Sequence, residues 1–352
     1  MSQDVGRKPE AYLSVSDLVV RFPSEDGIVH AVEGVSFSVT RGKTLAIVGE
    51  SGSGKSVTAQ AIMGLIDRRV ASLSGEVWLD GEELVSMPDE ELRGLRGLKM
   101  AMIFQDPMSS LHPFYRVGDQ LTEAALVHQK LSKSDARSLA IEMLRRVGIP
   151  APGQRVDDYP HQLSGGMRQR VMIAMALINS PALLIADEST TALDVTVQAQ
   201  ILELITKLQV EFDTAVILIT HDLGIVADIA DDVVVMYGGR LVEAAPTRRV
   251  YYAPEMPYTL GLLNSVPRMD RERVDRLDPI PGNPPSAVNL PEGCVFQPRC
   301  TYSHLVTDGA CVDRNPDLVE AEPGHFVRCH LPGAERRRIA DGVLATLAGD
   351  PA

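Results

Sequence analysis

Gly49-Glu50-Ser51-Gly52-Ser53-Gly54-Lys55-Ser56 is the stretch that decides the fold of this chain. It fits the pattern G-x-x-x-x-G-K-[ST], in which backbone N–H groups of a glycine-rich loop surround phosphate oxygens. The apolar run 44–48 before it is typical of a short buried strand, and residues 55–66 are typical of a helix. Because strand, loop and helix follow in the order that this motif requires, the sequence predicts a nucleotide-binding α/β domain.

The residue types in the loop each suit a phosphate ligand. Lys55 would reach the β- and γ-phosphates, and Ser56 would place its hydroxyl on Mg²⁺. The glycines allow the backbone to turn inward, and the N-terminus of the following helix adds a positive partial charge. The predicted phosphate-binding residues are Gly49, Glu50, Ser51, Gly52, Ser53, Gly54, Lys55 and Ser56.

Two adjacent carboxylates follow a second apolar run. Residues 183–186 are all apolar, and Asp187 and Glu188 come directly after them. Asp187 could hold Mg²⁺ directly or through water, and Glu188 could act as general base on an attacking water. Paired acids after a strand can also form a solvated turn or cap a helix, but the phosphate loop in the same chain favours the catalytic interpretation.

Two further polar residues end apolar runs. His221 follows residues 215–220 and could contact a γ-phosphate, whereas a lone histidine is more often structural. Gln105 ends the run that starts at residue 100 and suits a contact to the metal or to water. The chain contains no Asn-Lys-x-Asp motif for guanine, which favours ATP over GTP.

The order of the segments predicts one main domain and an extension. Strands alternate with helices in residues 171–237, which predicts a mostly parallel sheet with right-handed crossovers. Residues 106–166 have helical periodicity and form an insertion, and the Pro- and Gly-rich residues 279–285 form a connector. We therefore expect a nucleotide-binding domain over 12–265, a cysteine-containing extension over 266–335 and a tail over 336–352.

Composition excludes several classes. The 352 residues are 45% hydrophobic and carry a net charge of −13, which argues against a nucleic-acid-binding protein with its basic surface. No apolar run approaches the roughly 18 to 20 residues of a membrane helix, and the N-terminus lacks the pattern of a signal peptide. We expect a cytoplasmic protein whose contact with a membrane comes through a partner.

All four cysteines lie in the extension. Their spacing is Cys294-x5-Cys300-x10-Cys311-x17-Cys329, with His325 and His330 nearby as weaker candidate ligands. In a cytosolic protein a metal site explains such a group better than disulfides do. Four thiolates could hold a [4Fe–4S] cluster or a zinc ion, and the absence of a C-x2-C pair disfavours zinc. Ordinary reduced cysteines are the remaining alternative.

Further motifs carry a resemblance to a known family. With Leu163-Ser164-Gly165-Gly166 and Thr191-Ala192-Leu193-Asp194, the motifs above resemble ATPase subunits of ABC transporters over about residues 12–250. Residues 105–111 (QDPMSSL), 257–259 (PYT), 281–285 (PGNPP) and 293–300 (GCVFQPRC) resemble the subfamily that energises oligopeptide, dipeptide and nickel import in bacteria. The resemblance implies a P-loop (RecA-like) core with an antiparallel β subdomain, a helical insertion and a small C-terminal extension.

The resemblance also implies how the site works. Two such ATPases would pack head-to-tail around two ATP molecules, each gripped by Lys55, Ser56, Gln105, Asp187, Glu188 and His221 of one subunit. Ser164, Gly165 and Gly166 would close over the γ-phosphate bound by the partner, and Asp194 would lie at the seam. Phe22 would stack on adenine, although a core residue at the end of a strand is nearly as good an explanation. The region from Met108 to Phe114 would hold the coupling helix of the permease.

The implied partners are two membrane permease subunits, a second ATPase that is more often a paralogue than a copy, and an extracytoplasmic binding protein. The implied location is the cytoplasmic face of the membrane, and some relatives carry an iron–sulfur cluster in this extension. A peptide is the expected cargo, with nickel or another small solute as the alternative. A soluble ABC ATPase acting on ribosomes or DNA is disfavoured by the acidic charge and by the single copy of the motif Leu163-Ser164-Gly165-Gly166, because translation-type relatives usually carry two cassettes in one chain.

Two residues depart from the usual family pattern. Ser189 stands where proline commonly follows the acidic pair, and His112 stands where asparagine is frequent. Neither is a phosphate-binding position, so the sequence predicts an active ATPase.

Overall fold

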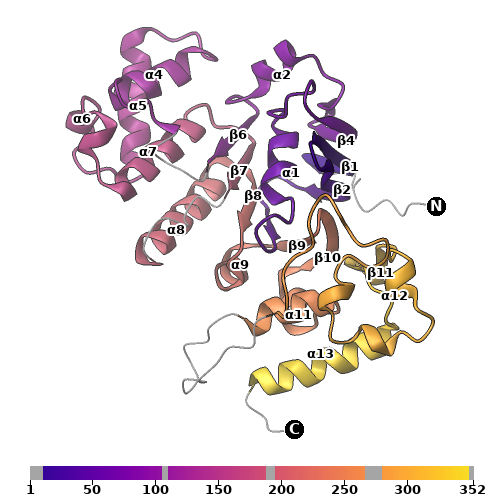
Figure 1. Cartoon of the computed structure of the whole chain (residues 1–352). Helices are drawn as coiled ribbons and strands as arrows, with labels where there is room; N and C mark the ends of the chain where they lie inside the picture. The colour runs from indigo at the N-terminus through magenta and orange to yellow at the C-terminus, as the bar shows by residue number, and fades with distance from the viewer. Residues whose placement is uncertain (1–10, 105–109, 188–194, 266–279, 349–352) are drawn as a thin grey trace.

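The computed structural model describes residues 11–104, 110–187, 195–265 and 280–348. Two sheets organise this part of the chain: a four-stranded sheet in the order β2-β1-β4-β5, and an eight-stranded sheet in the order β11-β12-β10-β9-β3-β8-β7-β6. Figure 1 shows the smaller sheet packed on one side of the larger one, with a group of helices (α4 to α7) at the β6 edge and the extension at the other edge.

The smaller sheet is antiparallel. Its strands are β1 (Leu13–Ser24), β2 (Gly27–Val39), β4 (Ser72–Leu79) and β5 (Glu82–Glu83). β1 and β2 form a hairpin with a tight turn, because Ser24 pairs with Gly27 and its hydroxyl donates to the Gly27 carbonyl oxygen.

The larger sheet has a parallel centre. Its parallel strands are β3 (Thr44–Val48), β6 (Met100–Ile103), β7 (Leu183–Asp187), β8 (Ala215–Thr220) and β9 (Asp232–Tyr237). Antiparallel β10 (Arg240–Pro246) pairs with β9, and β12 (His325–Val327) and β11 (Val319–Glu322) continue the sheet from β10. The predicted fold class is therefore confirmed, and the extension adds two strands that the sequence had not suggested.

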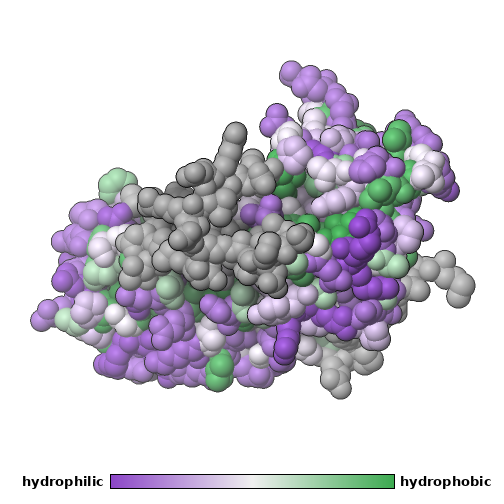
Figure 2. Space-filling view, turned by 90° about the horizontal axis from the view of Figure 1, so that it is seen from below, coloured by the Kyte–Doolittle hydropathy of each residue, from purple (hydrophilic) through white to green (hydrophobic). Residues whose placement is uncertain are grey.

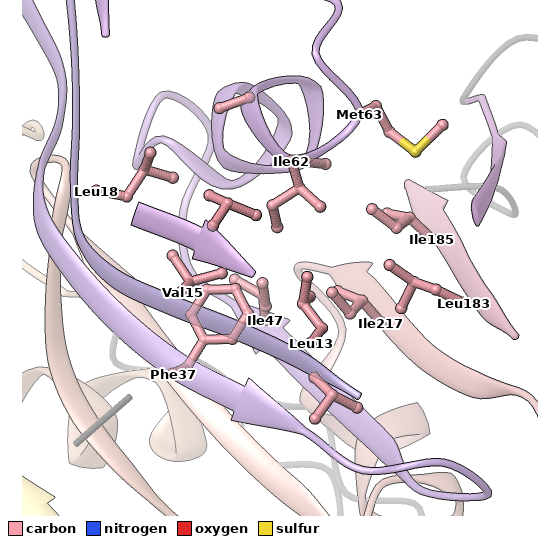
Figure 3. Close-up of a cluster of buried hydrophobic side chains, with 14 of the residues drawn as sticks. Leu13, Val15, Leu18, Phe37, Ile47, Ile62, Met63, Leu183, Ile185 and Ile217 are labelled. Atoms are coloured by element: carbon pink, nitrogen blue, oxygen red, sulfur yellow. The ribbon is translucent and has the colours of Figure 1, made fainter. Parts of the chain in front are cut away.

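Alternate residues of the central strands enter different cores, because successive side chains of a strand point to opposite faces. Ile217 of β8 belongs to the core between the two sheets, whereas Val216 and Leu218 face the core shared with the helical insertion. Figure 3 shows the first core, where side chains of β1, β3, β7, β8 and α1 meet. Both faces of the parallel strands are thus covered, as their continuous apolar runs predict.

The helices of the nucleotide-binding domain follow the strands. They are α1 (Lys55–Ile62), α2 (Asp89–Leu95), α4 (Val117–Leu126), α5 (Lys133–Arg146), α6 (Pro152–Arg155), α7 (Gly165–Leu177), α8 (Val195–Phe212) and α9 (Leu223–Ile229), with the short 3-10 helix Pro160–Gln162 before α7. α1 ends earlier than predicted because Gly64 has a φ of +61° and Arg96 donates to the carbonyl oxygens of Met63 and Gly64.

The extension packs against the far edge of the sheet. Its helices are α12 (Ala310–Asp313) and α13 (Gly333–Ala348), with 3-10 turns at Gln297–Arg299 and Ser303–Leu305, and it follows α10 (Thr247–Tyr252) and α11 (Pro257–Asn264). Val327 of β12 pairs with Glu243 of β10, and α13 lies along α11 (Figure 1). The predicted boundary near residue 266 lies outside the described residues, and this division stays a prediction.

Within the described ranges, no helix combines the length and the apolar character that crossing a membrane requires. Figure 2 views the molecule from below Figure 1, and hydrophilic residues cover most of the described surface that it shows.

Candidate nucleotide-binding site

The phosphate loop joins β3 to α1 through glycines that no other residue could replace. Gly49 has a φ of +152°, and a Cβ there would lie 2.2 Å from the Met236 carbonyl oxygen. Gly54 has a φ of +101°, and its Cβ would lie 2.4 Å from the Ala31 carbonyl oxygen. Other residues rarely adopt these backbone angles and would clash with the backbone of β9 or β2. The packing of the two neighbouring strands therefore shapes the loop.

Lys55 lies inside the curve of this loop. Its side chain is buried, and its Nζ donates to the carbonyl oxygens of Gly49 at 2.8 Å and Glu50 at 3.0 Å. A hydroxyl in the next turn of α1 also contacts the loop, because Thr58 Oγ1 donates to the Gly54 carbonyl oxygen at 2.9 Å. The lysine is thus held where a cation can meet phosphate oxygens that enter the loop.

Two of the predicted Mg²⁺ ligands touch each other. Ser56 Oγ donates to Asp187 Oδ1 at 3.0 Å, although the residues lie 131 positions apart, and Asp187 is buried at the end of β7. A hydroxyl and a buried carboxylate are oxygen ligands that Mg²⁺ prefers. Among the described residues no group of three or more His, Cys, Asp or Glu side chains could hold a metal ion. The pair fits a Mg²⁺ site that water and nucleotide phosphates complete.

Sheet order places His221 near this pair. Strand β8 lies between β3 and β7, and Val48 pairs with Thr220 while Asp187 pairs with Ile219. The carboxyl ends of these parallel strands meet at one edge of the sheet, where open α/β sheets bind their ligands. His221 follows Thr220 directly and is exposed there. Its predicted contact with the γ-phosphate stays a prediction.

The motif Leu163-Ser164-Gly165-Gly166 lies at the start of α7. Ser164 caps this helix, because its Oγ accepts a hydrogen bond from the Met167 N–H at 3.3 Å. Ser164 and Gly165 are exposed, and Gly166 is half-buried. α7 spans Gly165–Leu177, and Figure 1 shows it among the insertion helices. A helix N-terminus with exposed small residues can approach an anion of another molecule.

The described structure does not include every predicted site residue. Gln105, Glu188 and Asp194 lie outside the described residues, as does Ser189. Phe22 is half-buried, pairs with Val29 across the β1–β2 hairpin and packs against the core between the sheets. That packing favours the interpretation of Phe22 as a core residue, and its stacking on adenine stays a prediction.

The four cysteines are free thiols, of which Cys294 and Cys311 are buried. The Cys294 N–H donates to the Cys311 carbonyl oxygen at 2.9 Å. Burial raises the pKa of all four thiols, to about 11 for Cys300 and about 12 for Cys329. The described cysteines and histidines form no group of three or more that could hold a metal. The structure therefore gives no support to the predicted iron–sulfur cluster or to zinc.

Sequence reasoning missed two residues that contact the phosphate loop, Tyr258 and Arg299. The Glu50 N–H donates to the Tyr258 hydroxyl oxygen at 2.9 Å, and Arg299 pairs with the Glu50 side chain and contacts Tyr237. Tyr258 and Arg299 belong to the PYT and QPRC motifs that carried the subfamily resemblance. No sequence signal assigned them a partner, because 208 and 249 positions separate them from Glu50.

These features define an ATP-binding cassette: a glycine-shaped phosphate loop, a hydroxyl–carboxylate pair at the strand ends, and a helical insertion that presents its own helix N-terminus. The ABC transporter family model matches residues 32–191, and the model of the oligopeptide/dipeptide transporter C-terminal region matches residues 242–305.

Curated relatives match over nearly the full chain. The oligopeptide transport ATP-binding protein OppD of Salmonella typhimurium is 50% identical over 92% of this chain and 94% of its own. The dipeptide transport ATP-binding protein DppD of Bacillus subtilis is 51% identical over 97% of this chain and 100% of its own.

Proteins of solved structure are similar to this chain as well. The ATP-binding cassette MJ0796, in a dimeric post-hydrolysis state with ADP and Pi, is 27% identical with a TM-score of 0.60 over 67% of this chain and 99% of its own. cbiO1 of Clostridium perfringens, part of the ABC transporter complex cbiONQ, is 30% identical with a TM-score of 0.59 over 69% of this chain and 92% of its own. The chain belongs to the ABC transporter ATP-binding proteins, as the sequence resemblance predicted.

Proposed function

We propose that this protein is the ATP-hydrolysing subunit of a bacterial ABC importer for oligopeptides or dipeptides. The observation that carries this proposal is the identity of about half of all residues with oligopeptide and dipeptide transport ATP-binding proteins, extension included. The buried Lys55 and the Ser56–Asp187 pair supply the ATP chemistry. Nickel or another small solute is the alternative cargo, and no described feature favours it.

Each residue then has a proposed role. Lys55 would neutralise the β- and γ-phosphate oxygens, and Ser56 and Asp187 would hold the Mg²⁺ that offsets phosphate charge. Glu188 would take the proton of the attacking water, while Gln105 would orient the water or the metal. His221 would contact the γ-phosphate from the end of β8 and hold the water in line with it.

Two cassettes would share the nucleotide. The exposed N-terminus of α7, with Ser164 and Gly165 at its surface, suits the γ-phosphate of an ATP bound by the second ATPase. The similar cassette MJ0796 is dimeric in its solved structure. Asp194 would lie at the seam between the two sites. The second ATPase is proposed to be a paralogue.

An apolar cavity offers a place for the permease. It measures about 670 Å³ and lies where β6 and the end of α1 meet α4 and α7, with Phe104, Val127 and Met175 in its wall. The chain leads from Ser110, which lines this cavity, to Phe114, whose surface is 82% exposed. We propose that the coupling helix of a permease docks here, within the predicted region 108–114.

The proposed assembly contains two permease subunits, two ATPases and an extracytoplasmic binding protein, with this chain at the cytoplasmic face of the membrane. Affinity purification from gently solubilised membranes, followed by mass spectrometry, tests it. Two polytopic membrane proteins, a second ATPase and a binding protein are expected. Recovery of ribosomes or DNA in a soluble complex without membrane subunits would contradict transport and leave the ATP chemistry intact.

A [4Fe–4S] cluster on the four cysteines stays a separate proposal. Its support is the sequence, which places all four cysteines within residues 294–329 of a protein expected to be cytosolic. Iron and acid-labile sulfide in anaerobically purified protein would support it. Colourless protein without either would leave ordinary reduced cysteines.

A further inference from the structure

An arginine of the C-terminal extension reaches into the phosphate loop. Arg299 Nη1 lies 2.6 Å from Glu50 Oε2, and Arg299 Nη2 lies 3.0 Å from Glu50 Oε1. Only 5% of the Arg299 side chain is exposed, against 27% for Glu50. Two parallel N–H···O bonds hold a carboxylate in both position and orientation. The second residue of the phosphate loop is therefore fixed by a residue 249 positions away.

The Arg299 guanidinium also donates hydrogen bonds to three other residues. Arg299 Nε donates to the Pro281 carbonyl oxygen at 2.8 Å, and Nη2 donates to that of Ile280 at 3.3 Å. Nη1 also donates to the Tyr237 hydroxyl at 3.2 Å. Burial by itself would lower the pKa of Arg299, but the hydrogen bonds to Glu50 and Tyr237 raise it, so the cation is stable in its buried place. Arg299 therefore joins the connector, β9 and the loop.

The backbone of Glu50 is tied to the same region. Its N–H donates to the Tyr258 hydroxyl, and the rings of Tyr258 and Tyr237 lie 4.5 Å apart between centroids. Phe296 of the extension packs on both rings at 5.3 and 5.2 Å. The Glu50 backbone is thus hydrogen-bonded to this aromatic cluster directly, and the Glu50 side chain is connected to it through Arg299. The Glu50 carbonyl oxygen also accepts a hydrogen bond from Lys55 Nζ.

We infer that Arg299 is a positioning residue of the ATP site: by holding Glu50 it keeps the phosphate loop and Lys55 in the arrangement that receives the triphosphate, and it neutralises the one carboxylate in that loop. The inference rests on the proposed ATP binding. Without Arg299, the Glu50 carboxylate would stand uncompensated beside the phosphates, and repulsion together with loop movement would weaken ATP binding.

The extension has another anchor, which argues against a purely structural role for Arg299. Arg336 of α13 pairs with Glu255 at 2.8 Å, and both side chains are buried. This second pair attaches the extension through the segment before α11 and does not involve the phosphate loop. It provides a matched control, because Arg336, like Arg299, is a buried arginine paired with a glutamate, and Glu255 keeps only Arg337 at 3.5 Å when Arg336 is replaced.

The test compares Arg299→Met with Arg336→Met in the full-length purified chain, with ATP affinity measured by calorimetry and folding checked by circular dichroism. We expect Arg299→Met to raise the Kd for ATP about tenfold or more, and Arg336→Met to leave it within about twofold. In the assembled transporter, Arg299→Met should raise KM for ATP more than it lowers kcat.

Two companion variants separate charge from geometry. Arg299→Lys keeps the charge without the planar fork, so we expect a Kd between those of the native chain and Arg299→Met. Arg299→Met combined with Glu50→Gln removes the stranded charge and should recover part of the lost affinity. Arg299→Lys also provides the measurement if Arg299→Met fails to fold.

A result that contradicts the positioning role of Arg299 differs from one that contradicts the proposed function. Unchanged ATP affinity in Arg299→Met, or equal loss in Arg336→Met, would overturn the positioning role and leave the proposed function standing. Failure of the native chain to bind ATP would overturn the proposed function and this inference with it.

Discussion

At the scale of single residues, the site depends on contacts between side chains that are distant in the sequence. The sequence motifs identified Ser56 and Asp187 as separate candidates for one metal ion, and the structure brings their oxygens within 3.0 Å. A motif predicts the chemistry of a residue, but not which distant residue it touches. Arg299 illustrates the same limit, because its motif resembled a subfamily without indicating that its partner is Glu50.

Replacing Ser56 tests the metal pair. Ser56→Ala removes a hydroxyl that donates to Asp187 and would coordinate Mg²⁺, so we expect the Mg²⁺ concentration for half-maximal ATPase activity to rise about tenfold or more. Titrating Mg²⁺ at saturating ATP measures this change. Ser56→Thr keeps the hydroxyl and is the control. An unchanged Mg²⁺ requirement in Ser56→Ala would remove Ser56 from the ligand set.

Replacing Glu188 tests the proposed general base. Glu188→Gln keeps the size of the side chain and loses its basicity, so ATP binding should persist while the hydrolysis rate falls roughly 10²- to 10⁴-fold. Calorimetry with ATP and phosphate release at steady state measure the two effects separately. A normal hydrolysis rate in this variant would rule out Glu188 as the base.

At the scale of elements, hydrophobic period predicted most strands and helices of the nucleotide-binding domain. Residues 215–220 were predicted as a strand with the bounds that β8 has. The ends of other elements depended on contacts from elsewhere: Arg96 terminates α1, and Ser164 starts α7. Such ends are set by side chains that satisfy terminal backbone groups, which periodicity does not indicate.

The β1–β2 hairpin supplies a prediction about pH. Glu33 accepts hydrogen bonds from Arg21 at 2.6 and 2.8 Å and contacts His30 at 2.7 Å. Burial raises the pKa of the Glu33 carboxyl, but these partners outweigh burial and hold it below its usual value of 4.5. A carboxyl with a lowered pKa stabilises the fold above about pH 4.5, and this contribution is lost as pH falls through its folded value.

We therefore expect Glu33→Gln to lower the free energy of unfolding by about 1 to 3 kcal/mol at pH 7. The difference from the native chain should shrink as pH falls below about 4.5. Urea unfolding across pH 3.5 to 7 measures it, and exposed Glu25→Gln is the control. A difference that grows towards low pH would contradict the ionised pair.

At the scale of the whole molecule, the extension and the nucleotide-binding domain are one packed unit in the described residues. Strand β12 joins β10, α13 packs on α11, and Arg299 enters the nucleotide site. The sequence predicted a boundary from the Pro- and Gly-rich connector, yet the structure shows extensive contact beyond it. Composition reports the local stiffness of a chain and says nothing about the surface on which the chain then packs.

The attachment of α13 gives a prediction about stability. Arg336→Met leaves buried Glu255 without its closest cation, which should lower the free energy of unfolding by about 3 to 5 kcal/mol. Thermal or urea unfolding followed by circular dichroism measures the loss. Arg338→Met, which breaks the exposed pair with Glu335 on the same helix, should have a much smaller effect, because water screens that pair. Equal effects of the two variants would contradict the anchoring role of Arg336.

The sequence alone determined the class of this protein, because the phosphate loop, the acidic pair and the alternation of strands and helices are local patterns set by backbone geometry and hydrophobic period. Only the tertiary structure decided the order of the strands, the hydrogen bond between Ser56 and Asp187, and the ion pair between Arg299 and Glu50. The physical reason is that these contacts join residues 131 and 249 positions apart, and sheet pairing, burial and charge place them together only when the whole chain has packed.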